Sequence, residues 1–124
     1  MTNQPFVLAQ RMTADRLDGF ARAWLSCDLE ELSGYLTEDA LYSPLSGEVV
    51  RGRDAVVRRF AEVLADDRPH LLRYEPSTVS GSFGACRWRM AGRTGDGGRF
   101  TVEGVDLYEF SGSLIRVKDV YQKC

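Results

Sequence analysis

Four strand-like segments joined by very short turns make up the C-terminal part of the chain, and they constrain its fold more than any other feature. The segments are residues 71–80, 85–91, 99–110 and 114–121, and the turns between them are rich in glycine. A parallel pair would need a long crossover, which these connections are too short to provide. The segments therefore predict an antiparallel meander, and Pro76 indicates that the first strand is an edge strand or carries a bulge.

Helical periodicity dominates the first half of the chain. Apolar residues recur at the spacing of one helical face, as Leu17, Phe20, Ala21, Trp24 and Leu25. Thr13 is the expected N-cap of this helix, Asp28 caps a second short helix, and a third helix is expected over about residues 53–65. Short strands are expected at residues 40–43 and 48–51. Helices that precede an antiparallel sheet predict an α+β domain, with the helices covering one face of the sheet.

The length and charge of the chain limit its size class and its partners. Its 124 residues are expected to form a single domain, residues 1–124, with a core of its own. The net charge of −2 argues against nucleic acid or an anionic membrane as the main partner. No apolar run is long enough to span a bilayer.

The cysteines and the single histidine argue against a metal site or a disulfide framework. The three cysteines lie far apart in the sequence, and His70 alone cannot build a histidine-rich site. Residues 1–10 lack the basic-then-apolar pattern of a signal peptide. We therefore expect reduced thiols, a cytoplasmic location and no metal ion.

Alternation along the strands places two carboxylates on an apolar face. Cys86, Trp88 and Met90 share the face expected to lie against the helices. The equivalent faces of the last two strands contain Gly104, Asp106 and Tyr108, and Ile115, Val117, Asp119 and Tyr121. An unpaired charge on such a face is costly, so Asp106 and Asp119 indicate a pocket where a carboxyl group works as an acid or a base. Alternatively, either acid accepts a hydrogen bond from a tyrosine or lies at the rim of the sheet, and a bulge would reverse the assignment of faces.

Aromatic residues supply the remaining candidates for a ligand site. Tyr42 lies between two apolar neighbours and either offers its hydroxyl group to a ligand or packs in the core. Phe20 and Trp24 follow one helical face and either pack in the core or line a cavity. The expected ligand contacts on the strands are Trp88, Met90, Tyr108 and Tyr121.

The order of the elements, together with four motifs, resembles the nuclear-transport-factor-2-like superfamily, in particular its SnoaL-like and steroid-isomerase-like members. The motifs are Trp24–Leu32, Leu36–Ala40, Val50–Val56 and Val105–Phe110, and the likeness spans about residues 13–122. The resemblance implies a cone in which a curved antiparallel sheet wraps around three helices and leaves an apolar pocket. It also implies a homodimer formed through the outer sheet face, and chemistry that requires no cofactor.

The functional residues of these relatives carry over only in part. The oxyanion tyrosine of steroid isomerases falls on Phe20 and their general base on Ser43 or Pro44, so steroid isomerisation is disfavoured. Their second oxyanion donor, a protonated aspartic acid, and the acid/base aspartate of SnoaL-like cyclases fall on Asp106. The arginine that precedes the first acid of limonene-type epoxide hydrolases falls on Gly104, which weakens that activity.

The resemblance implies a cyclase or isomerase that acts on a hydrophobic substrate such as a polyketide-derived ketone. Asp106 would carry the proton or hold the oxyanion, Asp119 would be the second carboxylate, and Tyr42 and Tyr108 would orient the substrate. A second hypothesis is a binding or assembly module without turnover, in which Asp106 is structural. A third is epoxide opening, in which Asp106 and Asp119 share a water. The enzyme hypothesis predicts that Asp106→Asn loses activity with little change in melting.

Overall fold

A computed structural model describes residues 10–67 and 70–123 of the chain. Within these residues, three helices and seven strands form the fold. The helices are Ala14–Leu25 (α1), Leu29–Gly34 (α2) and Arg53–Asp67 (α3). The strands are Leu36–Ser43 (β1), Val50–Arg51 (β2), Leu71–Tyr74 (β3), Thr78–Ser80 (β4), Phe83–Arg93 (β5), Arg99–Ser111 (β6) and Leu114–Gln122 (β7).

The predicted caps begin the first two helices. The Thr13 hydroxyl accepts a hydrogen bond from the backbone N–H of Arg16 at 3.1 Å. The Asp28 carboxylate accepts one from the backbone N–H of Glu31 at 3.0 Å. Each contact satisfies an N–H group that has no partner inside the first helical turn. The apolar face of α1 then turns inward, and Phe20 is only 1% exposed.

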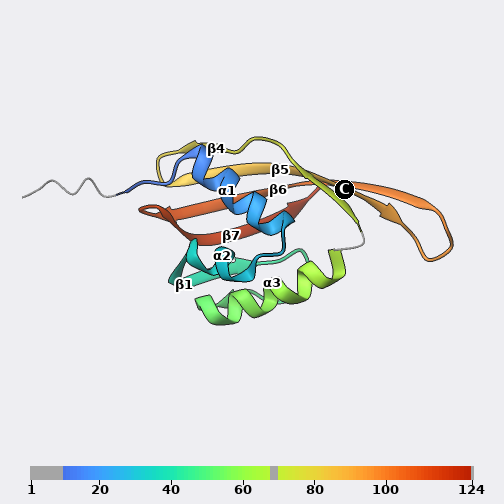
Figure 1. Cartoon of the computed structure of the whole chain (residues 1–124), viewed down its shortest axis with the longest axis horizontal. Coiled ribbons are helices and arrows are strands. Elements are labelled where there is room, and N and C mark those ends of the chain that lie inside the picture. Colours follow the sequence, from blue (N-terminus) through green and yellow to red (C-terminus); the bar gives the residue numbers. More distant parts are fainter. Residues whose placement is uncertain (1–9, 68–69, 124) are drawn as a thin grey trace, which may run out of the picture.

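One curved, open sheet in the strand order β2-β1-β7-β6-β5-β3 forms the other layer, with β4 also paired to β5. Strands β5, β6 and β7 pair antiparallel, as the short turns predict. Strand β1 pairs parallel with β7, so the sheet is mixed rather than purely antiparallel. The three helices lie on one side of the sheet, with α3 beside β1 (Figure 1). The predicted α+β arrangement is therefore confirmed.

The strand predicted over residues 71–80 is interrupted at Pro76. Strands β3 and β4 lie on either side of the proline, and both pair antiparallel with β5 along the edge of the sheet. Proline has no N–H to donate to a strand ladder, so the chain leaves the sheet there. The next N–H group, that of Ser77, donates to a carboxylate oxygen of Asp18 in α1 at 2.7 Å.

A bulge in β7 changes which side chains point inward. Phe110 pairs with Ile115, whereas the preceding residue, Glu109, pairs with Val117. Strand β7 therefore contains one residue more than β6 between these pairs, and Arg116 is the extra residue. A single inserted residue reverses the alternation of faces beyond it.

The bulge overturns the predicted faces of the last strand. Ile115 is buried as expected, but the next buried residue is Lys118, which is 2% exposed. Asp119 and Tyr121 lie on the outer face, where the Tyr121 hydroxyl donates to the Asp119 carboxylate at 2.8 Å and Tyr121 is 51% exposed. The expectation that Asp119 shares the inner face with Asp106 is therefore wrong.

Aromatic rings fill the space between the helices and the sheet. The ring of Phe60 in α3 is 0% exposed and meets three others edge to face. Its centroid lies 4.9 Å from that of Tyr42, 5.0 Å from that of Trp24 and 6.1 Å from that of Phe20. Such tilted contacts suit the ring quadrupoles and leave a rigid wall beside the inner sheet face.

Candidate functional site

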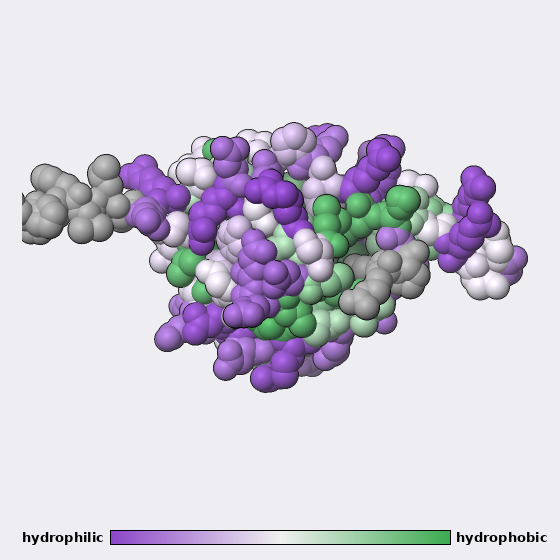
Figure 2. All heavy atoms as spheres, viewed as in Figure 1, coloured by the Kyte–Doolittle hydropathy of each residue, from purple (hydrophilic) through white to green (hydrophobic). Residues whose placement is uncertain are grey.

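A cavity of about 190 Å³ lies between the inner face of the sheet, α1 and α3. We call it the inner cavity. Its aromatic walls are Trp24, Tyr42, Tyr74 and Trp88, and its charged groups are Arg59, Asp66, Asp106 and Lys118. The space-filling view shows hydrophobic surface gathered around a hollow on the helix side of the molecule, with hydrophilic surface around it (Figure 2). The cavity is thus largely apolar but holds a few charged side chains, as small-molecule sites commonly do.

Asp106 is the buried acid of this cavity, at 2% exposure in the middle of β6. Its Oδ1 accepts a hydrogen bond from the Trp88 indole N–H at 3.0 Å. Its Oδ2 accepts from Lys118 Nζ at 2.8 Å and from the Tyr108 hydroxyl at 3.3 Å. Three donors on two oxygens satisfy a carboxylate that no longer has water around it. Asp106 lies in the apolar setting that the sequence predicts, but it accepts hydrogen bonds from three side chains and not from a tyrosine alone.

Lys118 is the partner that makes this burial tolerable. Its ammonium group forms a salt bridge with Asp106, with side-chain exposures of 3% and 2% for the two residues. A second N–H points to the Tyr108 hydroxyl oxygen at 3.3 Å. An ammonium group has three N–H donors, so one remains after these two contacts.

Aromatic rings surround the ammonium group on its other sides. Lys118 Nζ lies 4.8 Å from the ring centroid of Trp24 and 5.3 Å from that of Tyr108. The rings of Phe20 and Tyr42 are each 5.9 Å away. Cation–π attraction in such a dry setting is worth up to about 2 kcal/mol. The rings therefore stabilise the cation in addition to its hydrogen bonds with Asp106 and Tyr108.

Tyr108 acts as a neutral hydroxyl group in this cluster. Burial, followed by the nearby negative charge of Asp106, raises the pKa of Tyr108 well above its ordinary value of 10.0. The phenol thus keeps its proton. Its hydroxyl group donates a hydrogen bond to Asp106 and accepts one from Lys118. The three side chains form a closed triangle of hydrogen bonds at the back of the inner cavity.

The structure brings together seven of the nine predicted site residues. Five of them line the inner cavity: Trp24, Tyr42, Trp88, Met90 and Asp106. Phe20 and Tyr108 stand directly behind them, in contact with Lys118. Asp119 and Tyr121 lie on the opposite face of the sheet. The epoxide hypothesis required the carboxyl groups of Asp106 and Asp119 to share a water, and this arrangement separates them.

Lys118 is the residue that sequence reasoning missed. Simple alternation places it on the outer face with Arg116, and only the bulge turns it inward. A signal was nevertheless present, since a carboxylate on an apolar face needs a cationic or hydrogen-bonding partner. In the observed register, Lys118 pairs with Tyr108, and Tyr108 lies two residues from Asp106 in β6.

Trp88 also explains why position 104 is a glycine. A Cβ atom at Gly104 would lie 2.2 Å from the Trp88 ring and 2.3 Å from the Tyr121 backbone oxygen. Both distances are far below any real contact. The arginine that limonene-type epoxide hydrolases carry at this position therefore has no room here, because the indole needed by Asp106 occupies it.

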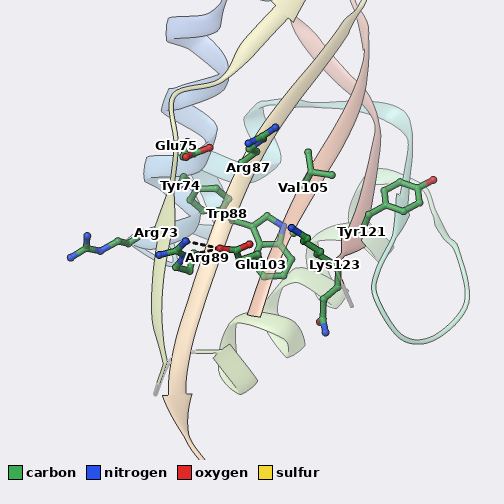
Figure 3. A pocket seen from close by; sticks show the side chains of 12 residues that line it. Arg73, Tyr74, Glu75, Arg87, Trp88, Arg89, Glu103, Val105, Tyr121 and Lys123 are labelled. Carbon is green, nitrogen blue, oxygen red and sulfur yellow. Dashed lines mark hydrogen bonds and ion pairs between the residues drawn. The ribbon is translucent and has the colours of Figure 1, made fainter. Parts of the chain in front are cut away.

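A second, larger hollow of about 700 Å³ lies on the outer face of the sheet, and we call it the outer groove. Figure 3 shows its charged side chains on neighbouring strands, with the side chains of Arg89 and Glu103 pointing toward each other. Arg89 donates twice to Glu103, and this contact lowers the pKa of the Glu103 carboxyl group. Arg73, Arg87 and Lys123 also line the groove, whereas neither Asp106 nor Lys118 does.

Neither a metal-binding cluster nor a membrane-spanning helix is present among the described residues. Among residues 10–67 and 70–123, no group of three or more His, Cys, Asp or Glu side chains is arranged to hold a metal ion. Within the same ranges, no helix has the length and apolar character needed to cross a bilayer. Among the described residues, the buried charged side chains are Asp106 and Lys118, and both line the inner cavity.

Similarity to known proteins agrees with this geometry. Residues 17–117 match the model of the SnoaL-like domain family. A comparison with curated proteins gives no match. Many solved structures share the fold. One is an NTF2-like protein of unknown function from Cytophaga hutchinsonii, with a TM-score of 0.76 and 14% identity, over 89% of this chain and 98% of that one.

Two further structures have more specific descriptions. A putative SnoaL-like polyketide cyclase from Jannaschia sp. aligns with a TM-score of 0.74 and 14% identity, over 99% of this chain and 91% of that one. SalBIII is described as an epoxide hydrolase/cyclase-like enzyme in pyran ring formation in the polyether salinomycin. It aligns with a TM-score of 0.72 and 16% identity, over 88% of each chain. At such identities these likenesses show a shared fold. Together with the domain match, they show that this chain belongs to the SnoaL-like family and has the NTF2-like fold.

Proposed function

We propose that the chain is a SnoaL-like enzyme that cyclises or isomerises a small hydrophobic carbonyl compound by general acid–base chemistry in the inner cavity. The observation that carries this proposal is the buried Lys118–Asp106 pair on the wall of an aromatic cavity. Buried ion pairs are poor devices for stability, and charged groups in a ligand-sized apolar cavity are typical of a reactive site. Two structures with the same fold, each described as a putative polyketide cyclase, support this class of reaction.

The two charged groups have complementary roles in the proposed reaction. The remaining N–H of Lys118 donates to the carbonyl oxygen of the substrate and stabilises the negative charge that develops there. Asp106 takes the proton from the adjacent carbon, which gives an enolate. Returning that proton to another carbon isomerises the substrate, and attack of the enolate on a second carbonyl closes a ring. A positioned base contributes about 10²–10⁴-fold and an oxyanion donor about 10²–10³-fold.

The cavity volume limits the size of the substrate. An apolar cavity of about 150 Å³ holds benzene, and the inner cavity has about 190 Å³. We therefore propose a substrate portion of roughly one or two rings inside the cavity. Trp24 and Tyr42 would stack on this portion, and Met90 would adapt to its outline.

Deuterium exchange tests the proposed proton transfer without knowledge of the natural substrate. Phenylacetone, a one-ring ketone with acidic C–H groups, is incubated with the protein in D₂O, and label uptake is followed by mass spectrometry. We expect exchange faster than in buffer, and a loss of about 100-fold or more in Asp106→Asn. Asp119→Asn is the matched control, because its carboxylate lies on the outer face; near-UV circular dichroism confirms that each variant is folded. Exchange that is absent, or equal in the two variants, would contradict the proposal.

A binding module without turnover is the second candidate, and one observation favours it. Asp106 already accepts three hydrogen bonds, which a purely structural acid would also do. This candidate predicts that small aromatic ketones bind in the inner cavity, while deuterium exchange stays at the buffer rate. Quenching of Trp24 and Trp88 fluorescence measures that binding directly.

We also propose a cytoplasmic homodimer that needs no cofactor. The outer face supports the dimer, since Leu107 is 42% exposed beside the outer groove and Tyr121 lies within it. Burial of this surface against a second copy would remove exposed apolar area from water. Sedimentation at micromolar concentration tests the dimer, and a monomer at that concentration would contradict it.

A further inference from the structure

Lys118 combines three features that suit a lysine for covalent chemistry. Its side chain is 3% exposed, it projects from the middle of a strand, and its ammonium group lines a cavity with aromatic walls. Low exposure and aromatic neighbours limit the access of water to this amine, which favours its attack on a carbonyl group. The carboxylate needed to accept a proton lies 2.8 Å away.

We propose that Lys118 forms an imine with an aldehyde or ketone that enters the inner cavity, so that the ligand is held covalently during the reaction. The inference rests on the proposed function, in that the ligand is a carbonyl compound, and it deepens that function by naming the nucleophile. Lysine is the residue type that forms such adducts, whereas arginine does not.

The step balances with the groups at hand. Asp106 Oδ2 takes one proton from Lys118 Nζ, and the freed electron pair forms a bond to the carbonyl carbon. A second proton passes from the nitrogen to the former carbonyl oxygen, which gives a carbinolamine. Asp106 then returns its proton to that hydroxyl group, the C–O bond breaks, and water leaves. The product is a protonated C=N group with Asp106 as its counter-ion, and no oxidant or reductant takes part.

The surrounding residues fit the positive charge of this product. The iminium nitrogen stays where the ammonium nitrogen was, within 4.8 Å of the Trp24 ring centroid and beside the Asp106 carboxylate. The Trp88 N–H holds Asp106 from the far side and fixes its orientation. A protonated imine withdraws electrons from the neighbouring carbon, so the same carboxylate is placed to take a proton there, as the proposed isomerisation requires.

The chain offers an internal control, because it contains two lysines, Lys118 and Lys123. Lys123 is exposed and lines the outer groove rather than the inner cavity. An ordinary surface amine therefore serves as the reference for a buried one in the same molecule. Lys123→Arg keeps the outer charge and removes the competing amine.

Reductive trapping tests the proposal on the intact protein. Benzaldehyde, a one-ring aldehyde, is added with sodium cyanoborohydride, and peptide mapping locates the benzyl group that becomes attached. We expect at least tenfold more label on Lys118 than on Lys123, unchanged labelling of Lys118 in Lys123→Arg, and protection of Lys118 alone by benzyl alcohol. Pyrenecarboxaldehyde, which has four rings, should label Lys123 but not Lys118. Because the main readout uses the unaltered chain, it does not depend on whether Lys118→Arg folds.

The outcomes separate this inference from the proposed function. Label on Lys123 with none on Lys118 overturns the inference that Lys118 forms an imine. If deuterium exchange in phenylacetone is still faster than in buffer, the proposed function stands, with Lys118 as a hydrogen-bond donor. Label on Lys118 without exchange supports the imine and contradicts the proposed turnover. Equal labelling of the two lysines also overturns the inference, since it would show that the cavity gives Lys118 no advantage.

Discussion

The buried salt bridge between Lys118 and Asp106 makes the sharpest prediction about stability. At 2.8 Å, two unit charges attract each other by about 6 kcal/mol at an effective dielectric constant of about 20. Most of that attraction offsets the cost of removing both charges from water. Asp106→Asn leaves the ammonium group buried with a neutral partner, and Lys118→Met leaves the carboxylate with only Trp88 and Tyr108. Each single variant should lose about 3–5 kcal/mol of unfolding free energy.

The double variant Lys118→Met/Asp106→Asn should be much less destabilised than the sum of its parts. Neither buried charge remains in this variant. The Asn side-chain carbonyl can still accept the hydrogen bond from Trp88, and Met occupies the space of the lysine methylene groups. We expect a coupling free energy of at least about 2 kcal/mol from urea unfolding, and melting temperatures about 10–20 °C lower in the single variants. The exposed pair Arg89–Glu103 is the control, with side-chain exposures of 64% and 42%. Its coupling should be about 0.2–1 kcal/mol. Equal coupling in the two pairs would refute the reasoning.

Three further predictions concern single positions. Gly104→Ala should lose about 1–3 kcal/mol or more of unfolding free energy, because the new Cβ atom would clash with the Trp88 ring. Gly34→Ala in helix α2 is the control: its new Cβ atom has no neighbour within 4 Å, so thermal melts should show a gain in unfolding free energy of about 0.5–1 kcal/mol. Burial raises the pKa of Cys86, so iodoacetamide at pH 8.5 should label Cys27 before Cys86; equal rates at these two thiols would contradict the burial. Tyr108 has a raised pKa in the folded state, so its contribution to stability is complete below pH 10 and is lost as pH rises above it; Tyr108→Phe should flatten that part of the stability profile.

Because Lys118 is buried against Asp106, the melting temperature of Asp106→Asn does not distinguish a catalytic acid from a structural one. The sequence alone predicts that this nearly isosteric change separates a catalytic acid from a structural one by melting temperature. The buried ammonium group makes the variant less stable under either hypothesis. Activity per folded molecule, measured below the melting transition, therefore replaces melting temperature as the criterion.

Local signals were sufficient for most of the fold. The caps at Thr13 and Asp28, the helical periodicity of α1 and the short turns between β5, β6 and β7 act over a few residues, so they can be recognised without the rest of the molecule. The inner faces of β5 and β6 were also predicted correctly, because their shared register runs without a break from Phe83 to Arg93. For that reason the sequence correctly placed Asp106 on the inner face of the sheet.

Contacts between distant segments were beyond such signals. The parallel pairing of β1 with β7 joins Tyr42 to Lys118, and no local pattern encodes it. The bulge in β7 likewise depends on how that strand fits between β1 and β6, where the Arg116 side chain reaches Glu109 at 2.6 Å. Without the bulge, alternation assigned Asp119 to the cavity and Lys118 to the surface, which is the reverse of what the structure shows.

The bulge at position 116 makes the chemistry of the cavity sensitive to strand register. Loss of the bulge at unchanged chain length would shift the pairing by one residue and place Asp119 opposite Asp106, converting a salt-bridged interior into a pair of acids, whereas deletion of Arg116 would leave Lys118 opposite Tyr108. A change of register in this strand would therefore change the chemistry of the cavity as much as a substitution does. Any alignment of the chain's relatives must place its gaps from strand register, or lysines and aspartates of opposite faces will share a column.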